Sequence, residues 1–199
     1  MKRGTVWVAI ALAVLGLAAA TATSILHDGL SASATPTRLE VFIARNVRHL
    51  SIPARARSSQ NPVGASAENL HAARLHFADH CASCHANDGS GDTPIGHGLY
   101  PKPPDLRKSD TQNLSDGEIF WIIENGVRFT GMPTFTIHGS NDDSWKLVLF
   151  IRHLPQLSVE ERLEMQRYNP KGPEDHDEEQ QEHDFLKGES QHEKPHHPQ

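Results

Sequence analysis

The sequence contains only two cysteines, Cys81 and Cys84, among its 199 residues. Two thiols three positions apart are too few for the disulfide framework of a small secreted domain, so they indicate a local chemical site. The chain also lacks any sustained alternation of apolar and polar residues, the pattern of a half-buried strand, and it has no internal repeat. These absences exclude a disulfide scaffold and favour an all-α fold.

A basic surface of the kind that binds nucleic acid is missing as well. The formal net charge is -6, and residues 169–199 account for all of it with nine acids against three lysines. Of the remainder, residues 1–60 sum to +5 and residues 61–168 to -5. A basic neck therefore precedes a mildly acidic domain, and no nucleic-acid partner is expected.

The one long apolar run lies at the N-terminus. Two basic residues precede an uncharged stretch from Gly4 to Leu26, whose apolar part runs from Val6 to Ala22. This length falls between that of a cleavable signal, about 7–15 residues, and that of a membrane span, about 17–25. Small-residue cleavage sites end at Ala22 and Ala34, but the uncharged stretch is long enough to favour an uncleaved anchor. In either case the rest of the chain is expected outside the cytoplasm.

Residues 38–50 have the spacing of an amphipathic helix, with arginines away from the apolar face. The apolar face comprises Leu39, Phe42, Ile43, Val47 and Leu50. Such a helix either lies on anionic headgroups or a partner, or packs on its own domain, and the sequence does not decide between these. Pro53 and the polar residues 58–62 then predict a linker.

Helices are predicted on both sides of a long irregular segment. Apolar residues three and four apart predict a helix over residues 67–80, leading into Cys81, whereas residues 86–113 are rich in Gly, Pro and Asp and predict a functional loop. Ser115 with Glu118 forms a capping box, which opens a helix that ends at Asn125-Gly126.

Two further helices are predicted after that loop region. One runs from about residue 143 to 153, capped by Asn141 or Asp142 and stopped by Pro155, with Trp145, Val148 and Leu149 facing inward. A second capping box, Ser158 with Glu161, opens a short helix that extends to about Arg167.

Cys81-Ala82-Ser83-Cys84-His85 is the attachment pattern of a c-type haem. Two thiols one helical turn apart can add across the two vinyl groups of a porphyrin, and the adjacent imidazole of His85 then falls under the iron. A redox dithiol would need a βαβ context, and a zinc site would need two further well-spaced ligands. The haem interpretation is favoured because neither context is apparent.

Met132 is the favoured second axial ligand. It lies in a Gly-Met-Pro turn between two helices, where a rigid loop can fold back over the iron. Met165 is better explained as a packing residue in a polar helix. His138 and His97 are alternative ligands, more simply explained as loop residues.

Residues 67–157 resemble a class I monohaem cytochrome c through the Cys-x-x-Cys-His motif, the Gly/Pro loop, the Gly-Met-Pro turn and the Trp-Lys-Leu-Val helix. The resemblance implies that Ala73 and Phe77 of the first helix meet Trp145 and Phe150 of the last. Ala73 and Ala86 stand where the family commonly has glycine. A proline carbonyl within residues 101–104 should orient the proximal imidazole. The expected pocket walls are Ile95, Leu99, Tyr100, Leu106, Ile119, Trp121, Ile122 and Phe135, of which Tyr100 and Trp121 could hydrogen-bond a propionate.

The wider chain resembles membrane-anchored bacterial cytochromes of the oxidase-subunit type. We expect a cytochrome c fold of three to five helices around one covalent haem c, an electron carrier of positive potential serving redox partners of a respiratory chain or a dehydrogenase. A displaceable sixth ligand would instead indicate a haem enzyme or a ligand sensor.

Four segments are expected along the chain. Residues 1–26 form a single-pass anchor or signal peptide of the bacterial cytoplasmic membrane, residues 27–63 a basic neck, and residues 64–168 a haem domain in the periplasm. Residues 169–199 form an acidic, histidine-rich disordered tail that is simply solvated, binds divalent metal weakly or docks to a basic partner.

Overall fold

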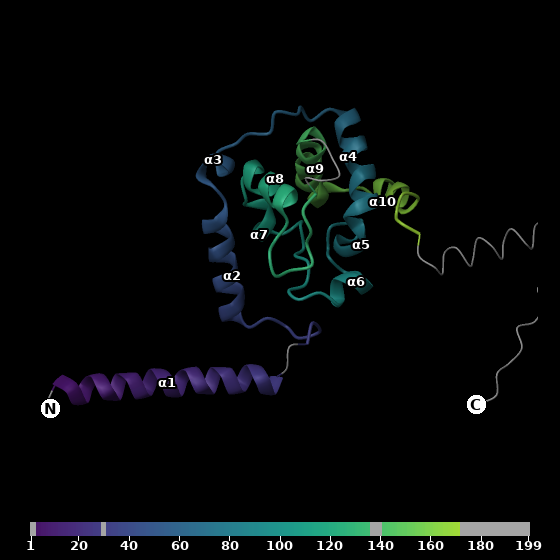
Figure 1. Ribbon diagram of the computed structural model, residues 1–199. Coiled ribbons are helices and arrows are strands. Elements are labelled where there is room, and N and C mark those ends of the chain that lie inside the picture. Colours follow the sequence, from purple (N-terminus) through teal and green to yellow (C-terminus); the bar gives the residue numbers. More distant parts are fainter. Residues whose placement is uncertain (1–2, 29–30, 136–140, 172–199) are drawn as a thin grey trace, which may run out of the picture.

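A computed structural model describes residues 3–28, 31–135 and 141–171 of the chain, and within these ranges it contains helices and loops but no strand (Figure 1). The all-α expectation is therefore confirmed. The helices are α1 (Arg3–Asp28), α2 (Arg38–Ser51), α3 (Ala54–Arg57), α4 (Ala67–His80), α5 (Ala82–His85), α6 (Pro94–His97), α7 (Ser109–Gln112), α8 (Asp116–Asn125), α9 (Asn141–His153), the 3-10 turn η1 (Leu154–Gln156) and α10 (Val159–Gln166). The expectations for residues 172–199 and for His138 lie outside the described residues.

Capping residues open two of the helices as predicted. Both predicted capping boxes are present, Ser115 with Glu118 at α8 and Ser158 with Glu161 at α10. The predicted cap of α9 is wrong, because Asn141 is already the first residue of that helix. Aspartates there still favour the helix, since negative charge in a first turn complements the helix dipole. The irregular segment 86–113 contains two single helical turns, α6 and α7, which are too short to show a period in the sequence.

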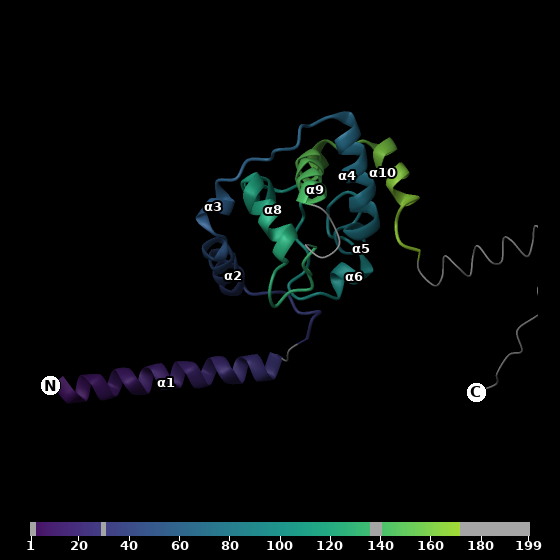
Figure 2. The ribbon, with the colours of Figure 1, turned by 45° about the horizontal axis from the view of Figure 1, so that its top comes forward.

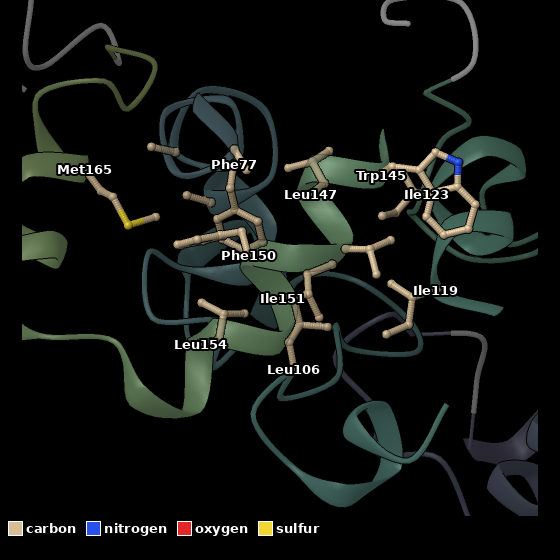
Figure 3. Close-up of a cluster of buried hydrophobic side chains, with 14 residues drawn as sticks. Phe77, Leu106, Ile119, Ile123, Trp145, Leu147, Phe150, Ile151, Leu154 and Met165 are labelled. Carbon is tan, nitrogen blue, oxygen red and sulfur yellow. The ribbon is translucent and has the colours of Figure 1, made fainter. Parts of the chain in front are cut away.

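The core forms where α4 crosses α9 (Figure 3). Phe77 of α4 and Phe150 of α9 are each 1% exposed, and their ring centroids lie 5.1 Å apart. Phe120 of α8 stacks on Trp145 at 4.0 Å, which joins a third helix to the pair. The implied contact of the first and last helices is therefore present, and aromatic pairs of this kind add roughly 0.5–1.5 kcal/mol each beyond area burial.

Helix α10 packs against α4 through a buried methionine and a set of ion pairs. Met165 is 0% exposed and belongs to the core cluster, where its flexible thioether fills space as expected. Arg74 of α4 pairs with Glu161 at 2.8 Å and also contacts Glu164. These contacts position α10 on the side of α4 that faces away from α8, as Figures 1 and 2 both show.

The neck is attached to the helical domain. Ile52, directly after α2, is 1% exposed, and α3 packs on α8 so closely that a Cβ on Gly117 would lie 1.8 Å from the carbonyl oxygen of Ala56. The segment predicted as a linker is also bound to the domain, because the side-chain amide of Asn61 donates a hydrogen bond to the carbonyl of Trp145 at 2.9 Å. Residues 52–63 therefore fix α2 to the domain.

Helix α1 lies apart from the other helices (Figure 1). Its segment Gly4–Ser24 is 21 residues long, is uncharged and mostly apolar, and has no buried residue, so length and composition allow it to cross a membrane. A helix of this length spans about 30 Å, the thickness of the hydrocarbon core of a bilayer.

Candidate functional site

The Cys-x-x-Cys-His motif lies at the junction of α4 and α5. Cys81 ends α4, its N–H donating to the carbonyl of Phe77 at 2.9 Å, and residues 82–85 add one further turn. The N–H of His85 donates to the carbonyl of Cys81 at 2.9 Å, which closes that turn. The local fold therefore places two thiols one turn apart with the imidazole immediately after them.

Both thiols are held in the neutral form. Neither cysteine takes part in a disulfide. Burial, with a smaller contribution from Cys84, raises the pKa of Cys81 to about 12, and burial also raises the pKa of Cys84. A redox dithiol of the thioredoxin type needs a lowered thiol pKa. The environment of this pair is thus the opposite of the one that a redox dithiol requires.

A zinc site is not supported either. Among the described residues, no group of three or more His, Cys, Asp or Glu side chains is arranged to hold a metal ion. A structural zinc site needs four such ligands at tetrahedral positions. The two thiols and His85 thus fit a covalent porphyrin better than a metal bound by side chains alone.

His85 is a half-buried imidazole with an unusual hydrogen-bonding state. Its Nδ1 atom is buried and makes no hydrogen bond of normal geometry to any described residue. Burial lowers the pKa of His85, and the carbonyl of Pro104 partly opposes this by raising it. A neutral imidazole with one nitrogen directed at a carbonyl keeps the other available as a metal ligand. Pro104 is therefore the proline of the 101–104 run whose carbonyl acts on His85.

A salt-bridge network fastens the Pro104 segment to the segment that follows His85. Arg107 donates from Nε to Asp105 Oδ1 at 2.9 Å and from Nη1 to Asp88 Oδ2 at 2.7 Å. The hydrogen bonds from Arg107 hold the pKa of Asp105 down at about 2. The N–H of Leu106 also donates to the carbonyl of Gly89 at 2.8 Å. The network, which we call the Arg107 brace (Asp88, Asp105 and Arg107), was not recognised in the sequence.

Residues 86–96 fold back tightly against the motif. The N–H of Gly91 donates to the carbonyl of His85 at 2.8 Å. A Cβ on Gly96 would lie 2.9 Å from the carbonyl oxygen of Cys84, so only glycine permits this approach without displacement. Ala86 adopts φ 58° and ψ 159°, a conformation that glycine occupies far more readily. The glycine expected from the family at this position thus has a backbone reason.

The Met132 turn packs against the end of α8. The N–H of Val127 donates to the carbonyl of Met132 at 3.2 Å, and the N–H of Met132 donates to Thr130 Oγ1 at 3.1 Å. Gly126 has φ 64°, and a Cβ there would lie 2.7 Å from the Met132 carbonyl oxygen. Met132 itself is half-buried. The backbone around this methionine is therefore tightly constrained.

The Met132 turn also meets the loop that follows α6. A Cβ on Gly131 would lie 2.6 Å from the side chain of Leu99. In Figures 1 and 2 the segment after α8 runs between α8 and α6. The two irregular segments that carry Met132 and Pro104 thus lie on the same side of the α4–α9 core.

The remaining predicted site residues separate into core and surface. Leu106 and Ile119 are buried, at 8% and 3% exposure, whereas Ile95 is 55% exposed. Leu99, Trp121, Ile122 and Phe135 are half-buried. Tyr100 donates its hydroxyl to Glu40 at 3.0 Å, so it is engaged with the neck. His97 is mostly exposed and lies 2.8 Å from Asp92, which agrees with a loop role.

Comparison with known families finds one match. Residues 68–151, from the first turn of α4 to near the end of α9, match the family described as cytochrome C oxidase, cbb3-type, subunit III. No curated protein matches the chain. The matched range contains the Cys-x-x-Cys-His motif, Pro104, the Arg107 brace and Met132, and it excludes α1, α2, α3 and α10.

Proposed function

We propose that this protein is an electron carrier with one covalent haem c, bound through Cys81 and Cys84 and ligated by His85 and Met132. The proposal is supported by the match of residues 68–151 to the subunit III family of cbb3-type cytochrome c oxidase. The observation that carries the proposal is the placement of His85. Its imidazole directly follows the turn that carries the two thiols, and its buried Nδ1 makes no hydrogen bond of normal geometry. The Pro104 carbonyl raises the pKa of His85, against the larger lowering by burial. That arrangement fits a proximal haem ligand.

Each residue of the motif has a distinct task. Cys81 and Cys84 would hold the haem through two thioether bonds, each made by addition of one thiol S–H to one vinyl group. The carbonyl of Pro104, which acts on the His85 imidazole, would help to orient the ring, and the Arg107 brace holds the Pro104 segment in place. When bound, the haem supplies a ferric/ferrous couple that holds one electron at a time.

Met132 determines that the site transfers electrons and does not bind small ligands. Its thioether is a neutral, soft ligand that favours the ferrous form and raises the reduction potential. Contacts with Gly126 and Thr130 constrain the backbone of the turn, which supports a fixed place for this methionine. With Met132 as a ligand, the iron would have no free site for oxygen, and we therefore propose an electron carrier and not an enzyme.

The segments that precede the haem domain determine where the carrier is located. We propose that residues 1–26, which include most of α1, remain as a single-pass anchor and that residues 27–63 form the neck. Residues 64–168 form the haem domain on the periplasmic side of the bacterial cytoplasmic membrane, with residues 169–199 as a tail. The length and apolar composition of α1 support this placement. The family match supports a redox partner in a respiratory oxidase complex.

Visible spectroscopy of a matched pair of variants tests the ligand assignment. Leu has nearly the volume of Met, so Met132→Leu removes only the thioether, and Met165→Leu makes the same change in the buried core. The haem-loaded full chain and Met165→Leu should both show sharp ferrous bands and the weak far-red ferric band of thioether ligation. Met132→Leu should lose the far-red band while keeping its haem.

The opposite spectra would reject the ligand assignment. If Met132→Leu retains the far-red band, another side chain provides the thioether or the band has another origin. If the unmodified protein is high-spin or binds carbon monoxide readily, the sixth position is displaceable, and a haem enzyme or ligand sensor becomes the better description.

A further inference from the structure

Helix α2 is attached to the haem domain through its polar side. Arg45 pairs with Asp110 of α7 at 2.5 Å, and His49 Nδ1 lies 3.0 Å from Glu118 of α8. Near the start of the helix, Glu40 accepts from Tyr100 at 3.0 Å, and Thr37 caps the first turn. Together with the buried Ile52 after its last turn, these contacts hold α2 against the α7–α8 side of the domain.

The apolar face of α2 points away from the domain. Of the 14 residues of the helix, none is buried, and the two half-buried ones, Val41 and Arg48, lie on the domain side. The five large apolar side chains of the opposite face are Leu39 (66% exposed), Phe42 (65%), Ile43 (50%), Val47 (59%) and Leu50 (78%). At 100° per residue they form one continuous stripe. The structure thus excludes the alternative in which this face packs on its own domain.

We propose that this stripe of α2 is a membrane-docking surface that lies in the headgroup region of an anionic bilayer and sets the orientation of the haem domain. Chain length supports the membrane as occupant. Residues 29–37 connect α1 to α2 and, fully extended, reach at most about 30 Å. A stripe that begins this close to a membrane-spanning helix has lipid headgroups within reach.

Charge favours anionic lipid in particular. Between Arg38 and Arg57 the chain carries five arginines against one glutamate, Glu40. An apolar stripe flanked by arginines is the composition of helices that lie in a membrane interface. Helix α10 provides a contrast within the same chain: it also exposes Val159 and Leu163, at 56% each, but among three glutamates.

The attachment of α2 determines which side of the domain faces the bilayer. In Figures 1 and 2, α2 lies on one side of the domain, and α4 and α10 lie on the other. With α2 in the headgroup region, the α7–α8 side faces the membrane, and the α4–α10 side faces the aqueous phase. A redox partner in solution would then meet the domain from the α4–α10 side or from its edges.

Spin-label accessibility tests the docking surface in the full-length, haem-loaded protein in bilayer discs of phosphatidylglycerol. Single cysteines replace Leu39, Ile43 or Leu50 on α2, and Val159→Cys and Leu163→Cys serve as matched exposed apolar controls on α10. The parent protein, treated with the same label, gives the background from Cys81 and Cys84. Collision rates with oxygen, which concentrates in lipid, are compared with those of a water-soluble nickel complex.

The expected result is an oxygen-to-nickel ratio several times higher at the three α2 positions than at the two α10 positions, and lower α2 ratios in phosphatidylcholine discs. Ratios on α2 equal to those on α10 would overturn the proposal, because the stripe would then lie in water. Low collision rates with both reagents would also overturn it, because a protein surface and not lipid would cover the stripe.

The inference rests on the proposed membrane location of α1, so a label at Leu15→Cys separates the two claims. A lipid-exposed Leu15 label with water-exposed α2 labels means that α2 alone has been misassigned. A water-exposed Leu15 label means that the anchor proposal has failed, whatever the α2 labels report.

Discussion

At Ala86 an L-amino acid occupies backbone angles that suit glycine, φ 58° with ψ 159°. Holding a residue other than glycine in this region costs about 1–3 kcal/mol of stability. Glycine removes that strain, but its greater flexibility in the unfolded chain offsets about 0.5–1 kcal/mol of the gain. Ala86→Gly should therefore raise the free energy of unfolding by about 1 kcal/mol, measured by urea denaturation.

Ala72→Gly is the matched control for this change. Ala72 is exposed within α4, where helical angles suit alanine, so the same substitution should lower stability by about 1 kcal/mol. We therefore expect changes of opposite sign in the free energy of unfolding for Ala86→Gly and Ala72→Gly. A loss of stability in both would show that residue 86 is not strained.

Asp105 should contribute to stability in a pH-dependent way. The hydrogen bonds from Arg107 depress its pKa from 3.8 to about 2, and its side chain is only 14% exposed. The pKa is lower in the folded state, so the contribution is fully present above about pH 5 and is lost as the pH falls toward 2. From the linkage relation its size is about 2 kcal/mol.

Urea unfolding of the wild type and Asp105→Asn at several pH values measures this contribution. The stability difference between the two should shrink steadily between about pH 4.5 and pH 2.5. Titration of other groups affects both proteins alike and cancels in the difference. A difference that stays constant over this range would contradict the pairing of Asp105 with Arg107.

Site residues that are neighbours in the sequence could be predicted well. Site residues whose role depends on contacts between distant segments could not. Cys81, Cys84 and His85 are neighbours in one helical turn, so their spacing already predicts their geometry. The choice of Pro104 among three prolines of the run 101–104 depends on Arg107 reaching Asp88, 19 residues earlier. No local pattern predicts that contact.

The crossing of α4 and α9 carries the stability of the domain. Phe77 is 1% exposed, packs on Phe150 and belongs to the buried core cluster. Phe77→Ala should lower the free energy of unfolding by about 3–5 kcal/mol, because it removes buried area and leaves a cavity. Leu163→Ala on α10, where the side chain is 56% exposed, should change stability by less than about 0.5 kcal/mol.

Thermal and urea unfolding of the haem-loaded proteins would check both values. An effect of Phe77→Ala no larger than that of Leu163→Ala would mean that the α4–α9 contact does not form the core.

The boundaries of α8 could be predicted because a capping box and apolar spacing coincide there, and those of α4 could be predicted from apolar spacing alone. Single turns such as α6 and α7 were not, because four residues cannot display a helical period. For α2 the sequence predicted the helix and its apolar stripe but not the direction of that stripe. The direction depends on Arg45 and His49 reaching Asp110 and Glu118, which are more than 60 residues away.

At the scale of the whole molecule, α1 should keep the protein in the membrane. The full chain should stay in the pellet after alkaline carbonate extraction, which releases peripheral proteins. Replacing Leu12 and Leu15 by arginine should prevent this retention, because each arginine near the centre of a span costs about 2.5–3.5 kcal/mol. Leu12→Phe with Leu15→Phe is the apolar control. Release of the unmodified protein by carbonate would contradict the anchor.

The mass of the intact, denatured protein tests the central claim most directly. The protein is expressed with a haem-attachment system, unfolded in acid and guanidinium, and weighed by mass spectrometry. We predict a single species heavier than the polypeptide by one haem, with a proteolytic peptide containing Cys81 and Cys84 that carries the whole increment. A mass equal to that of the bare polypeptide, or a haem lost on unfolding, would contradict the assignment of this chain as a carrier with one covalent haem c.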